Sequence, residues 1–424
     1  MNILFVHQNF PGQFRHVAPE LARLGHRVVA LGVNATPHKL RGVEHLFHQP
    51  GTDDGLREGA PAALAELHGK LVRGDSAARA MTELKARGFV PDVVFAHPGW
   101  GEALYIKDVF PAARLLIYAE YYYGAEGGDL AFDPEFTRLD LPNLTQARLK
   151  NTHLLHALAA ADAGLSPTEF QRDQHPAWFH PRITVLHDGI DTQRFVPDPK
   201  ASVSLRSAGV TLRAGEEVLT FVARELEPYR GFHTFMRSLP LLQRLRPQAR
   251  IVIVGGDGAS YGRAAPAGTT WKQVFLKEVA GGLDMSRIHF VGKVPHEVLT
   301  QLMQVSAAHV YLTYPFVLSW SVLEAMSCGA LVIGSRTGPV QEVIRDGENG
   351  LLVDFFDAQG LADRAVAALA EPERYAGMRA AARASVIERY DLRTRSLPRQ
   401  IALVEDLAGS ARPAAEQSGL AQAS

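Results

Sequence analysis

The sequence predicts two α/β domains, each with a parallel β-sheet between layers of helices. In both halves of the chain, short apolar stretches that suit buried strands alternate with segments of helical character. The length of 424 residues exceeds what one hydrophobic core usually serves, so two domains of roughly 200 residues each are expected. A glycine turn and a proline-rich stretch at residues 197–199 lie between the halves, where a linker is expected.

Composition limits the class of protein. The net charge of -1 disfavours a nucleic-acid partner, because backbone phosphates must be neutralised by an excess of Lys and Arg. Cys328 is the only cysteine, so the chain has no intrachain disulfide and no Cys/His zinc motif. The first residues are typical of a strand and not of a signal peptide. The uncharged stretch between His309 and Glu324 is shorter than the roughly 20 residues that cross a bilayer. We therefore expect a cytoplasmic protein.

The first thirty residues predict the opening of a doubly wound sheet. A strand at 3–6, a helix at about 14–24 and a second strand at 27–31 form a βαβ unit, whose ligands bind beyond the carboxyl ends of the strands. Gly12 lies in the loop at that edge. The residues alone leave open whether it only makes the turn or also faces a ligand. Asp53 and Asp54 are the one paired carboxylate within residues 51–74, and we expect them in a solvated loop.

Two further strands of the first half end in polar residues. The strand at 93–96 leads to His97, which could bind a sugar hydroxyl or serve packing only. The strand at 115–118 leads to Glu120 and three tyrosines, including Tyr122. Aromatic faces and carboxylates suit a carbohydrate cleft, and they equally suit a packed loop. A helix at 144–160 and a strand at 163–166 complete this half.

The second half begins with a pair of cations. Arg224 follows the strand at 218–223, and Arg230 follows a proline turn six residues later. Guanidinium groups at one strand exit can converge on a diphosphate, because their forked donors match phosphate oxygens. The glycine turn at 255–258 is a weak dinucleotide fingerprint, since it follows an interior strand. The strand at 288–292 ends at Gly292.

The most informative stretch of the chain is residues 314–329. A strand enters a turn at Pro315, and a helix follows for which Ser319 or Ser321 is the expected cap. The free N–H groups and the positive dipole end of that helix would form a seat for phosphate. Glu324, about one turn further on, would meet a pair of ribose hydroxyls.

The sequence Glu324-Ala-Met-Ser-Cys-Gly329 resembles the second half of the signature of the family 4 glycosyltransferases. That signature has two glutamates eight positions apart with Gly-Phe-Gly between them. Here Phe316 stands at the first glutamate, and Val317 and Ser319 stand where glycines are usual.

The resemblance extends to other segments. Arg224 matches the arginine of the family's Gly-Arg-Leu…Lys-Gly pattern, and Arg230 takes the lysine position. Residues 183–195 resemble the segment that joins the two domains in these transferases.

The resemblance implies the GT-B fold, with two Rossmann-like domains facing across a cleft. Residues 1–185 would form the acceptor domain and residues 186–385 the nucleotide-sugar donor domain. A last helix at about 386–407 would pack back onto the first domain, and residues 408–424 would be a disordered tail.

The resemblance also implies sugar transfer with retention from a nucleoside-diphosphate sugar, with no other cofactor. The chain contains no Asp-x-Asp, so we expect the diphosphate to be stabilised without a metal, by Arg224, Arg230 and a helix N-terminus. His97 would position the reacting groups and Glu324 would bind the donor ribose. The remaining donor candidates are Gly12, Gly292, Val294, Phe316, Ser319, Trp320 and Ser321, and the acceptor candidates are Glu120 and Tyr122.

Phe316 leaves a second function open. A chain that lacks the first glutamate could bind nucleotide sugars, or act as an interaction protein of the same fold, without turnover. A Rossmann oxidoreductase is disfavoured because no glycine fingerprint follows the first strand. Carbohydrate, lipid-linked and small-molecule acceptors all remain open, as in polysaccharide or glycolipid biosynthesis, and so does a peripheral contact with a membrane.

Overall fold

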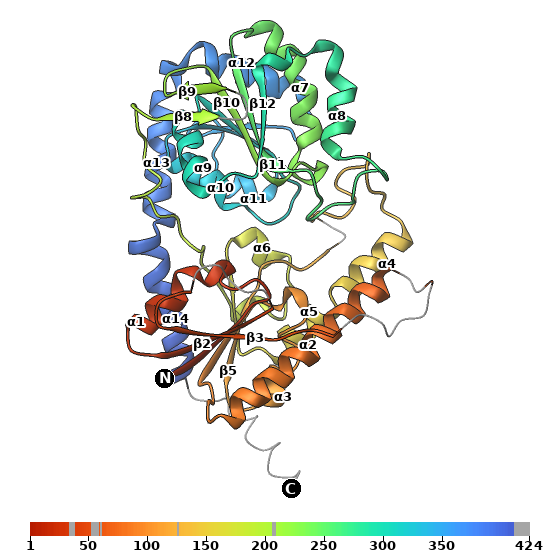
Figure 1. The fold of residues 1–424 in the computed structure, drawn as a ribbon, viewed down its shortest axis with the longest axis vertical. Coiled ribbons are helices and arrows are strands. Elements are labelled where there is room, and N and C mark those ends of the chain that lie inside the picture. Colours follow the sequence, from red (N-terminus) through yellow and green to blue (C-terminus); the bar gives the residue numbers. More distant parts are fainter. Residues whose placement is uncertain (34–38, 52–58, 60–61, 125–126, 206–208, 411–424) are drawn as a thin grey trace.

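The computed structural model describes residues 1–33, 39–51, 59, 62–124, 127–205 and 209–410. It shows two α/β lobes stacked along the long axis of the molecule (Figure 1). Each lobe has a purely parallel main sheet, so the predicted pair of parallel sheets is confirmed. Asp53, Asp54 and residues 411–424 lie outside the described residues.

The first lobe contains a seven-stranded sheet in the order β3-β2-β1-β4-β5-β6-β7. Its strands are β1 (Asn2–Val6), β2 (Arg27–Gly32), β3 (Val43–Phe47), β4 (Val93–Ala96), β5 (Arg114–Tyr118), β6 (Ala163–Ser166) and β7 (Ile183–Val185). Its helices are α1 (Val17–Arg23), α2 (Ala62–Ala86), α3 (Ile106–Val109), α4 (Leu141–Lys150), α5 (Thr152–Ala160) and α6 (Glu169–Asp173).

The second lobe contains a six-stranded sheet in the order β12-β11-β10-β13-β14-β15, and an antiparallel pair of strands, β8 (Ser202–Leu205) and β9 (Val210–Arg213), that the sequence did not predict. The sheet strands are β10 (Val218–Glu225), β11 (Arg250–Gly256), β12 (Ile288–Gly292), β13 (Ala308–Tyr311), β14 (Leu331–Ser335) and β15 (Leu351–Val353). The helices are α7 (Phe232–Leu245), α8 (Trp271–Val279), α9 (His296–Val305), α10 (Trp320–Ser327), α11 (Gly338–Gln341), α12 (Ala358–Ala370), α13 (Ala376–Tyr390) and α14 (Leu397–Gly409).

The central strands explain why these sheets are parallel and covered. Every residue of β4, β5 and β13 is buried, so both faces of these strands need apolar cover. Continuous apolar runs of this kind, separated by helices, are the pattern that predicted the fold.

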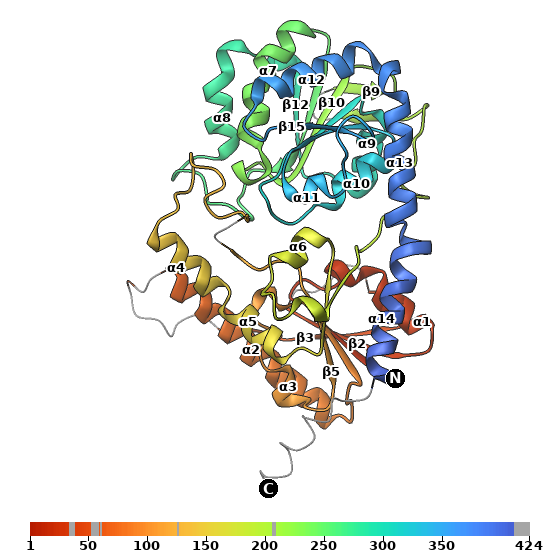
Figure 2. The same cartoon turned by 180° about the vertical axis from the view of Figure 1, so that it is seen from behind.

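The chain crosses between the lobes a second time near its end. Figures 1 and 2 show α13 and α14 running along one side of both lobes. Asp391 starts the crossing by accepting hydrogen bonds from the backbone N–H groups of Arg393 and Thr394. Val404 of α14 is fully buried in the core of the first lobe. The C-terminal helix therefore fastens the second lobe to the first.

The predicted single helix at residues 144–160 is wrong, because the chain forms α4 and α5 with Asn151 between them. The Asn151 amide explains the break. It accepts a hydrogen bond from the Tyr123 N–H at 2.9 Å and donates one to the Tyr123 carbonyl at 2.6 Å. These bonds tie the junction of the helices to the loop that follows β5.

That loop then packs into the other lobe. Phe132 lies with its ring centroid 5.2 to 5.3 Å from those of Tyr314, Phe355 and Phe356. Asp133 is 1% exposed, accepts a hydrogen bond from the Tyr314 hydroxyl at 2.8 Å, and belongs by sequence to the first half of the chain. Part of the second lobe's core therefore comes from the first half.

We predict that Phe132→Ala lowers the free energy of unfolding by about 2 kcal/mol, because it removes a partly buried ring from a packed contact between lobes. Denaturant unfolding followed by circular dichroism measures the change. Leu139→Ala, at a side chain that is 62% exposed, is the matched control and should change stability little. Equal effects of the two substitutions would contradict the packing role.

Candidate functional site

The carboxyl edges of the two sheets meet between the lobes. Tyr121, just after β5, donates a hydrogen bond from its hydroxyl to the carbonyl of Pro315, just after β13, at 3.0 Å. Ligands of open α/β sheets bind beyond the carboxyl ends of the strands. The residues that follow β1, β4 and β5 in one lobe, and β10, β12 and β13 in the other, therefore form the candidate site.

In the first lobe, a chain of hydrogen bonds connects His7 with Glu120, and His97 lies beside the same carboxylate. His7 Nδ1 accepts from the Asn9 N–H at 2.9 Å, so His7 Nε2 carries the proton and donates it to Gln13 Oε1, also at 2.9 Å. The Gln13 amide then donates to Glu120 Oε1 at 2.9 Å. His97 Nδ1 accepts from the Gly99 N–H, and His97 Nε2 lies 3.4 Å from Glu120 Oε2.

The surroundings of this hydrogen-bonded chain determine the charge of His7 and of Glu120. Burial, reinforced by the nearby His97, lowers the pKa of His7 to about 3, so His7 is neutral at physiological pH. Burial works to raise the pKa of Glu120, but His97, His7 and the Gln13 hydrogen bond outweigh it and hold the pKa below its ordinary value. Glu120 is therefore an ionised acceptor beside the imidazole of His97.

Gly12 is required by its close approach to His7. Its φ of +48° lies in the left-handed region, and a Cβ at this position would lie 2.4 Å from His7 Nε2. The backbone of this loop therefore lies against the ring that starts the hydrogen-bond chain.

In the second lobe, the guanidinium of Arg230 is buried. Its Nη1 donates to Thr313 Oγ1 at 2.8 Å and to the Val317 carbonyl at 3.1 Å, and the ring of Tyr261 lies 5.0 Å from Cζ. Burial works to lower the pKa of Arg230, but contacts with Tyr311 and Tyr261 raise it, so the group stays charged. No carboxylate of the described residues lies within ion-pair distance of it.

Arg224 and Gly292 lie at the neighbouring strand exits. The Arg224 side chain is exposed, and within the described residues it forms no ion pair. Glu225 instead turns inward and pairs with Lys293, next to Gly292, whose φ is +65°. Val294 packs partly buried against an apolar cluster under β10 and β11.

The N-terminus of α10 lies beside Arg230. Ser319 caps the helix, as predicted, by accepting a hydrogen bond from the Ser321 N–H, and its own N–H donates to Tyr311 Oη at 2.7 Å. The same tyrosine hydroxyl lies 3.3 Å from Arg230 Nη1. We use the name "anion site" for Arg224, Arg230 and the start of α10.

Glu324 is buried one turn into α10. Its Oε1 lies 3.2 Å from Nε2 of His296 at the start of α9. Glu324 is thus held on the same helix whose N-terminus faces Arg230, and the three predicted residues Arg224, Arg230 and Glu324 share one edge of the second sheet.

Trp320 connects the lobes. Its ring lies 4.8 Å from Cζ of Arg15 in the first lobe, and its Nε1 donates to Asp188 Oδ2 at 2.8 Å. Asp188 also accepts from the Tyr118 hydroxyl at 2.9 to 3.0 Å, and Tyr118 stacks on His97 with centroids 5.4 Å apart. Burial raises the pKa of Asp188 to about 7 against the opposing effect of these hydrogen bonds.

Phe316, which stands at the position of the family's first glutamate, lies in an aromatic cluster. Four tyrosines surround its ring with centroids 4.5 to 6.5 Å away; these are Tyr121 and Tyr123 of the first lobe and Tyr229 and Tyr261 of the second. Phe316, His97 and Glu120 also line a small cavity of about 60 Å³. The aromatic cluster therefore closes one side of the cleft next to His97.

The structure separates the three tyrosines that sequence analysis grouped. Tyr121 and Tyr123 pack into the aromatic cluster, whereas the ring of Tyr122 lies 6.1 Å from that of His175. Arg15 and Asp188 were missed as site residues. Arg15 is an isolated cation in the Gly12 loop and Asp188 an isolated acid in the linker, so neither belongs to a sequence pattern that indicates the cleft.

One group among the described residues has the composition of a metal site. Ligand atoms of Asp133, Glu135 and His233 lie within 4.8 Å of one another. Both carboxylates are already engaged, since Asp133 accepts from Tyr314 and Glu135 forms two hydrogen bonds of 2.8 Å with Arg237. None of the three residues lines the small cavity that contains His97.

Two facing lobes with parallel sheets and one shared cleft define the GT-B class of glycosyltransferases. Residues 24–195 match the family described as glycosyl transferase family 4 group, and residues 207–385 match glycosyl transferases group 1. The chain belongs to the family 4 glycosyltransferases.

Curated relatives are glycosyltransferases as well. The chain is 27% identical over 241 residues to the GDP-mannose-dependent alpha-(1-6)-phosphatidylinositol monomannoside mannosyltransferase of Mycolicibacterium smegmatis, a match that covers 55% of this chain and 60% of that one. It is 27% identical over 293 residues to the D-inositol 3-phosphate glycosyltransferase of Rhodococcus jostii, which covers 64% and 62%. The chain thus spans about 60% of the length of these relatives.

Solved structures share the fold. A sucrose-phosphate synthase from Thermosynechococcus elongatus has a TM-score of 0.72 at 19% identity, covering 97% of this chain and 100% of that one. The Anabaena protein HepE in complex with UDP-glucose has a TM-score of 0.64 at 18% identity and the same coverage. Within the described residues, we find no helix with the length and apolar character of a membrane span.

We predict a specific pH dependence from Asp188. Its pKa is raised on folding, so its contribution to stability is full below the unfolded value near 4 and is lost as the pH rises toward 7. The advantage of the wild type over Asp188→Asn in unfolding free energy should therefore fall by up to about 1.4 kcal/mol per pH unit in this window. Chemical denaturation at several pH values measures it, and a constant difference would contradict the raised pKa.

We also predict that Gly12→Ala destabilises the fold by about 2 kcal/mol more than Gly25→Ala. Both glycines have a positive φ, but a Cβ on Gly25 would meet nothing within 4 Å, whereas one on Gly12 would displace the His7 ring. The free energies of unfolding of the two variants test this. Similar losses would show that the His7 contact is not rigid.

Proposed function

We propose that the chain transfers a sugar from a nucleoside-diphosphate sugar to an acceptor hydroxyl, with retention of configuration and without a metal. The buried guanidinium of Arg230, which has no carboxylate partner among the described residues, is the observation that carries this proposal. It lies beside the N-terminus of α10 at the carboxyl edge of the second sheet. A diphosphate supplies the negative charge that such a position favours.

The anion site would stabilise the leaving group. As the bond between the anomeric carbon and the diphosphate oxygen breaks, negative charge develops on the diphosphate. Arg230 and the start of α10 are fixed before the reaction, and exposed Arg224 could close onto the phosphates. The acceptor oxygen would bond to the anomeric carbon from the same face, and its proton would pass to the departing phosphate oxygen.

The remaining candidates have positioning roles in this proposal. Glu324, held by His296, would accept hydrogen bonds from the donor ribose. The backbone near Gly292 and Val294 would line the base. His97, with its Nε2 toward Glu120, would orient the sugar or the acceptor hydroxyl.

The relatives suggest the substrate classes. The names of two of them include GDP-mannose and an inositol phosphate, and HepE is seen with UDP-glucose. We propose a purine or pyrimidine nucleoside-diphosphate hexose as the donor. A polyhydroxylated acceptor, free or carried on a lipid headgroup, would bind mainly to the first lobe.

Phe316 favours one competing function. The aromatic cluster fills the place where the resembled family has its first glutamate, so a protein that binds nucleotide sugars without turnover would have the same contacts. Donor binding without release of nucleoside diphosphate, under every acceptor tried, would favour that function.

We predict that Arg224→Met lowers the rate of nucleoside diphosphate release tenfold or more, because a charge-assisted phosphate contact contributes about 1.5 to 3 kcal/mol. Release is measured with UDP-, GDP- and ADP-sugars in the presence of EDTA, which should leave the wild-type rate unchanged. Arg224 is exposed, so its loss should not affect folding.

The matched control is Arg244→Met, at an exposed cation near the end of α7 and away from the cleft. It should keep the wild-type rate. Turnover within about twofold of wild type in Arg224→Met would contradict the role of the anion site.

A further inference from the structure

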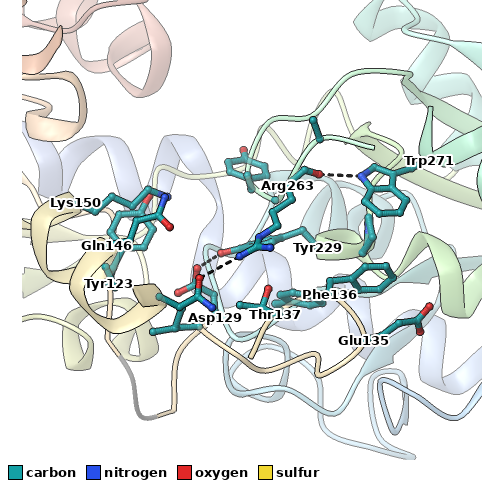
Figure 3. A pocket seen from close by; sticks show the side chains of 18 of the residues that line it. Tyr123, Asp129, Glu135, Phe136, Thr137, Gln146, Lys150, Tyr229, Arg263 and Trp271 are labelled. Atoms are coloured by element: carbon teal, nitrogen blue, oxygen red, sulfur yellow. Dashed lines mark hydrogen bonds between the residues drawn. The ribbon is translucent and has the colours of Figure 1, made fainter. Parts of the chain in front are cut away.

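A large pocket of about 600 Å³ lies between the lobes (Figure 3). One wall is α4, which presents Asn143, Gln146 and Lys150 on one helical face, because they are three and four residues apart. The opposite wall is formed by residues 261–264, by Pro266 and by Trp271 at the start of α8. Binding pockets for small ligands commonly have volumes of roughly 300 to 1,000 Å³.

The floor of the large pocket is aromatic. Tyr229 and Tyr314 lie with ring centroids 4.6 Å apart, and Phe136 meets Trp271 at 5.2 Å. The Trp271 indole N–H donates to the Arg263 carbonyl at 2.9 Å, which fixes the ring against the wall. Rigid aromatic faces of this kind can pack against the C–H surface of a sugar ring.

The carboxylates of the lining are already engaged. Asp129 accepts a hydrogen bond from the Tyr229 hydroxyl, and its other carboxylate oxygen lies 3.1 Å from the Tyr121 hydroxyl. Glu135 is held by two hydrogen bonds of 2.8 Å from Arg237. Asp129 is thus hydrogen-bonded to tyrosine, and the charge of Glu135 is balanced by Arg237. Neither carboxylate is left free to bind a cationic ligand.

The cations of the lining are available. Lys150 Nζ lies 4.5 Å above the ring of Tyr123 and forms no hydrogen bond or ion pair within the described part of the chain. Arg263 uses one guanidinium nitrogen, in a bond of 3.1 Å to Asn143 Oδ1 of α4. Figure 3 shows Lys150 and Arg263 approaching the pocket from opposite lobes. An anionic group between them would meet charge from both sides.

We propose that the large pocket binds an anionic carbohydrate, with the sugar ring on the aromatic floor and a carboxylate or phosphate between Lys150 and Arg263. Tyr123 and Lys150 also line the small cavity beside His97, so a glycan held here would extend toward that residue. The role of the pocket as an acceptor subsite rests on the proposed function, whereas the binding itself does not.

The test is a saturation-transfer NMR titration of the full chain, without nucleotide sugar, using glucuronate, glucose 6-phosphate and glucose. We expect at least one charged sugar to bind about fivefold or more tightly than glucose at low salt, and added salt to reduce the difference. Lys150→Met and Arg263→Met should each weaken the charged sugars about fivefold and leave glucose unchanged. Preference for glucuronate or for glucose 6-phosphate identifies the anion as a carboxylate or a phosphate.

One control locates the binding. Lys277→Met, at an exposed cation of α8 outside the pocket, should leave the affinities unchanged. Equal affinity for glucose and the charged sugars, unchanged binding in the Lys150 and Arg263 variants, or no binding of any probe would overturn the proposal. Nucleoside diphosphate release is measured separately, so charged-sugar binding without release would contradict the proposed function and retain this site.

Discussion

Removing a guanidinium from water costs several kcal/mol unless hydrogen bonds or an opposite charge replace its hydration. Arg230 is buried with hydrogen bonds from Nη1 to Thr313 and Val317, and with aromatic rings around its plane. No carboxylate of the described residues forms an ion pair with this guanidinium. The loop after β13 and the start of α10 are therefore organised around a positive charge that an anionic ligand would neutralise.

The relative position of the two lobes depends on direct contacts between them, which a division of the chain into two independent domains leaves out. Asp188 accepts hydrogen bonds from Tyr118 in one lobe and Trp320 in the other. The aromatic cluster joins the loops after β5 and β13, and Phe132 and Asp133 lie within the core of the second lobe. These contacts fix the distance between His97 and the anion site, and any opening of the cleft must break some of them.

Much of the fold could be predicted from local pattern. The apolar strands β4, β10 and β13 alternate with helices, and the cap at Ser319 follows from helix chemistry alone. The division of residues 141–160 into α4 and α5 could not be predicted, because it depends on the hydrogen bonds of Asn151 to the distant Tyr123. Long-range contacts of this kind leave no periodic signal.

The sequence could predict the candidate site only where its residues are close together along the chain. Arg224 and Arg230 are six residues apart, and Glu324 lies on the helix that Ser319 caps, so spacing could associate them. Arg15 and Asp188 meet Trp320 from positions more than 100 residues away. The family motif also could not predict the surroundings of Phe316, because its ring packs among tyrosines that lie outside the motif.

The most direct measurement is a crystal structure of the protein with a bound nucleoside diphosphate. Our account predicts phosphate oxygens within hydrogen-bond distance of the Arg230 guanidinium and of the backbone N–H groups at the start of α10, with the ribose near Glu324. A diphosphate bound in the large pocket, or anywhere that leaves Arg230 without an anionic partner, would contradict it.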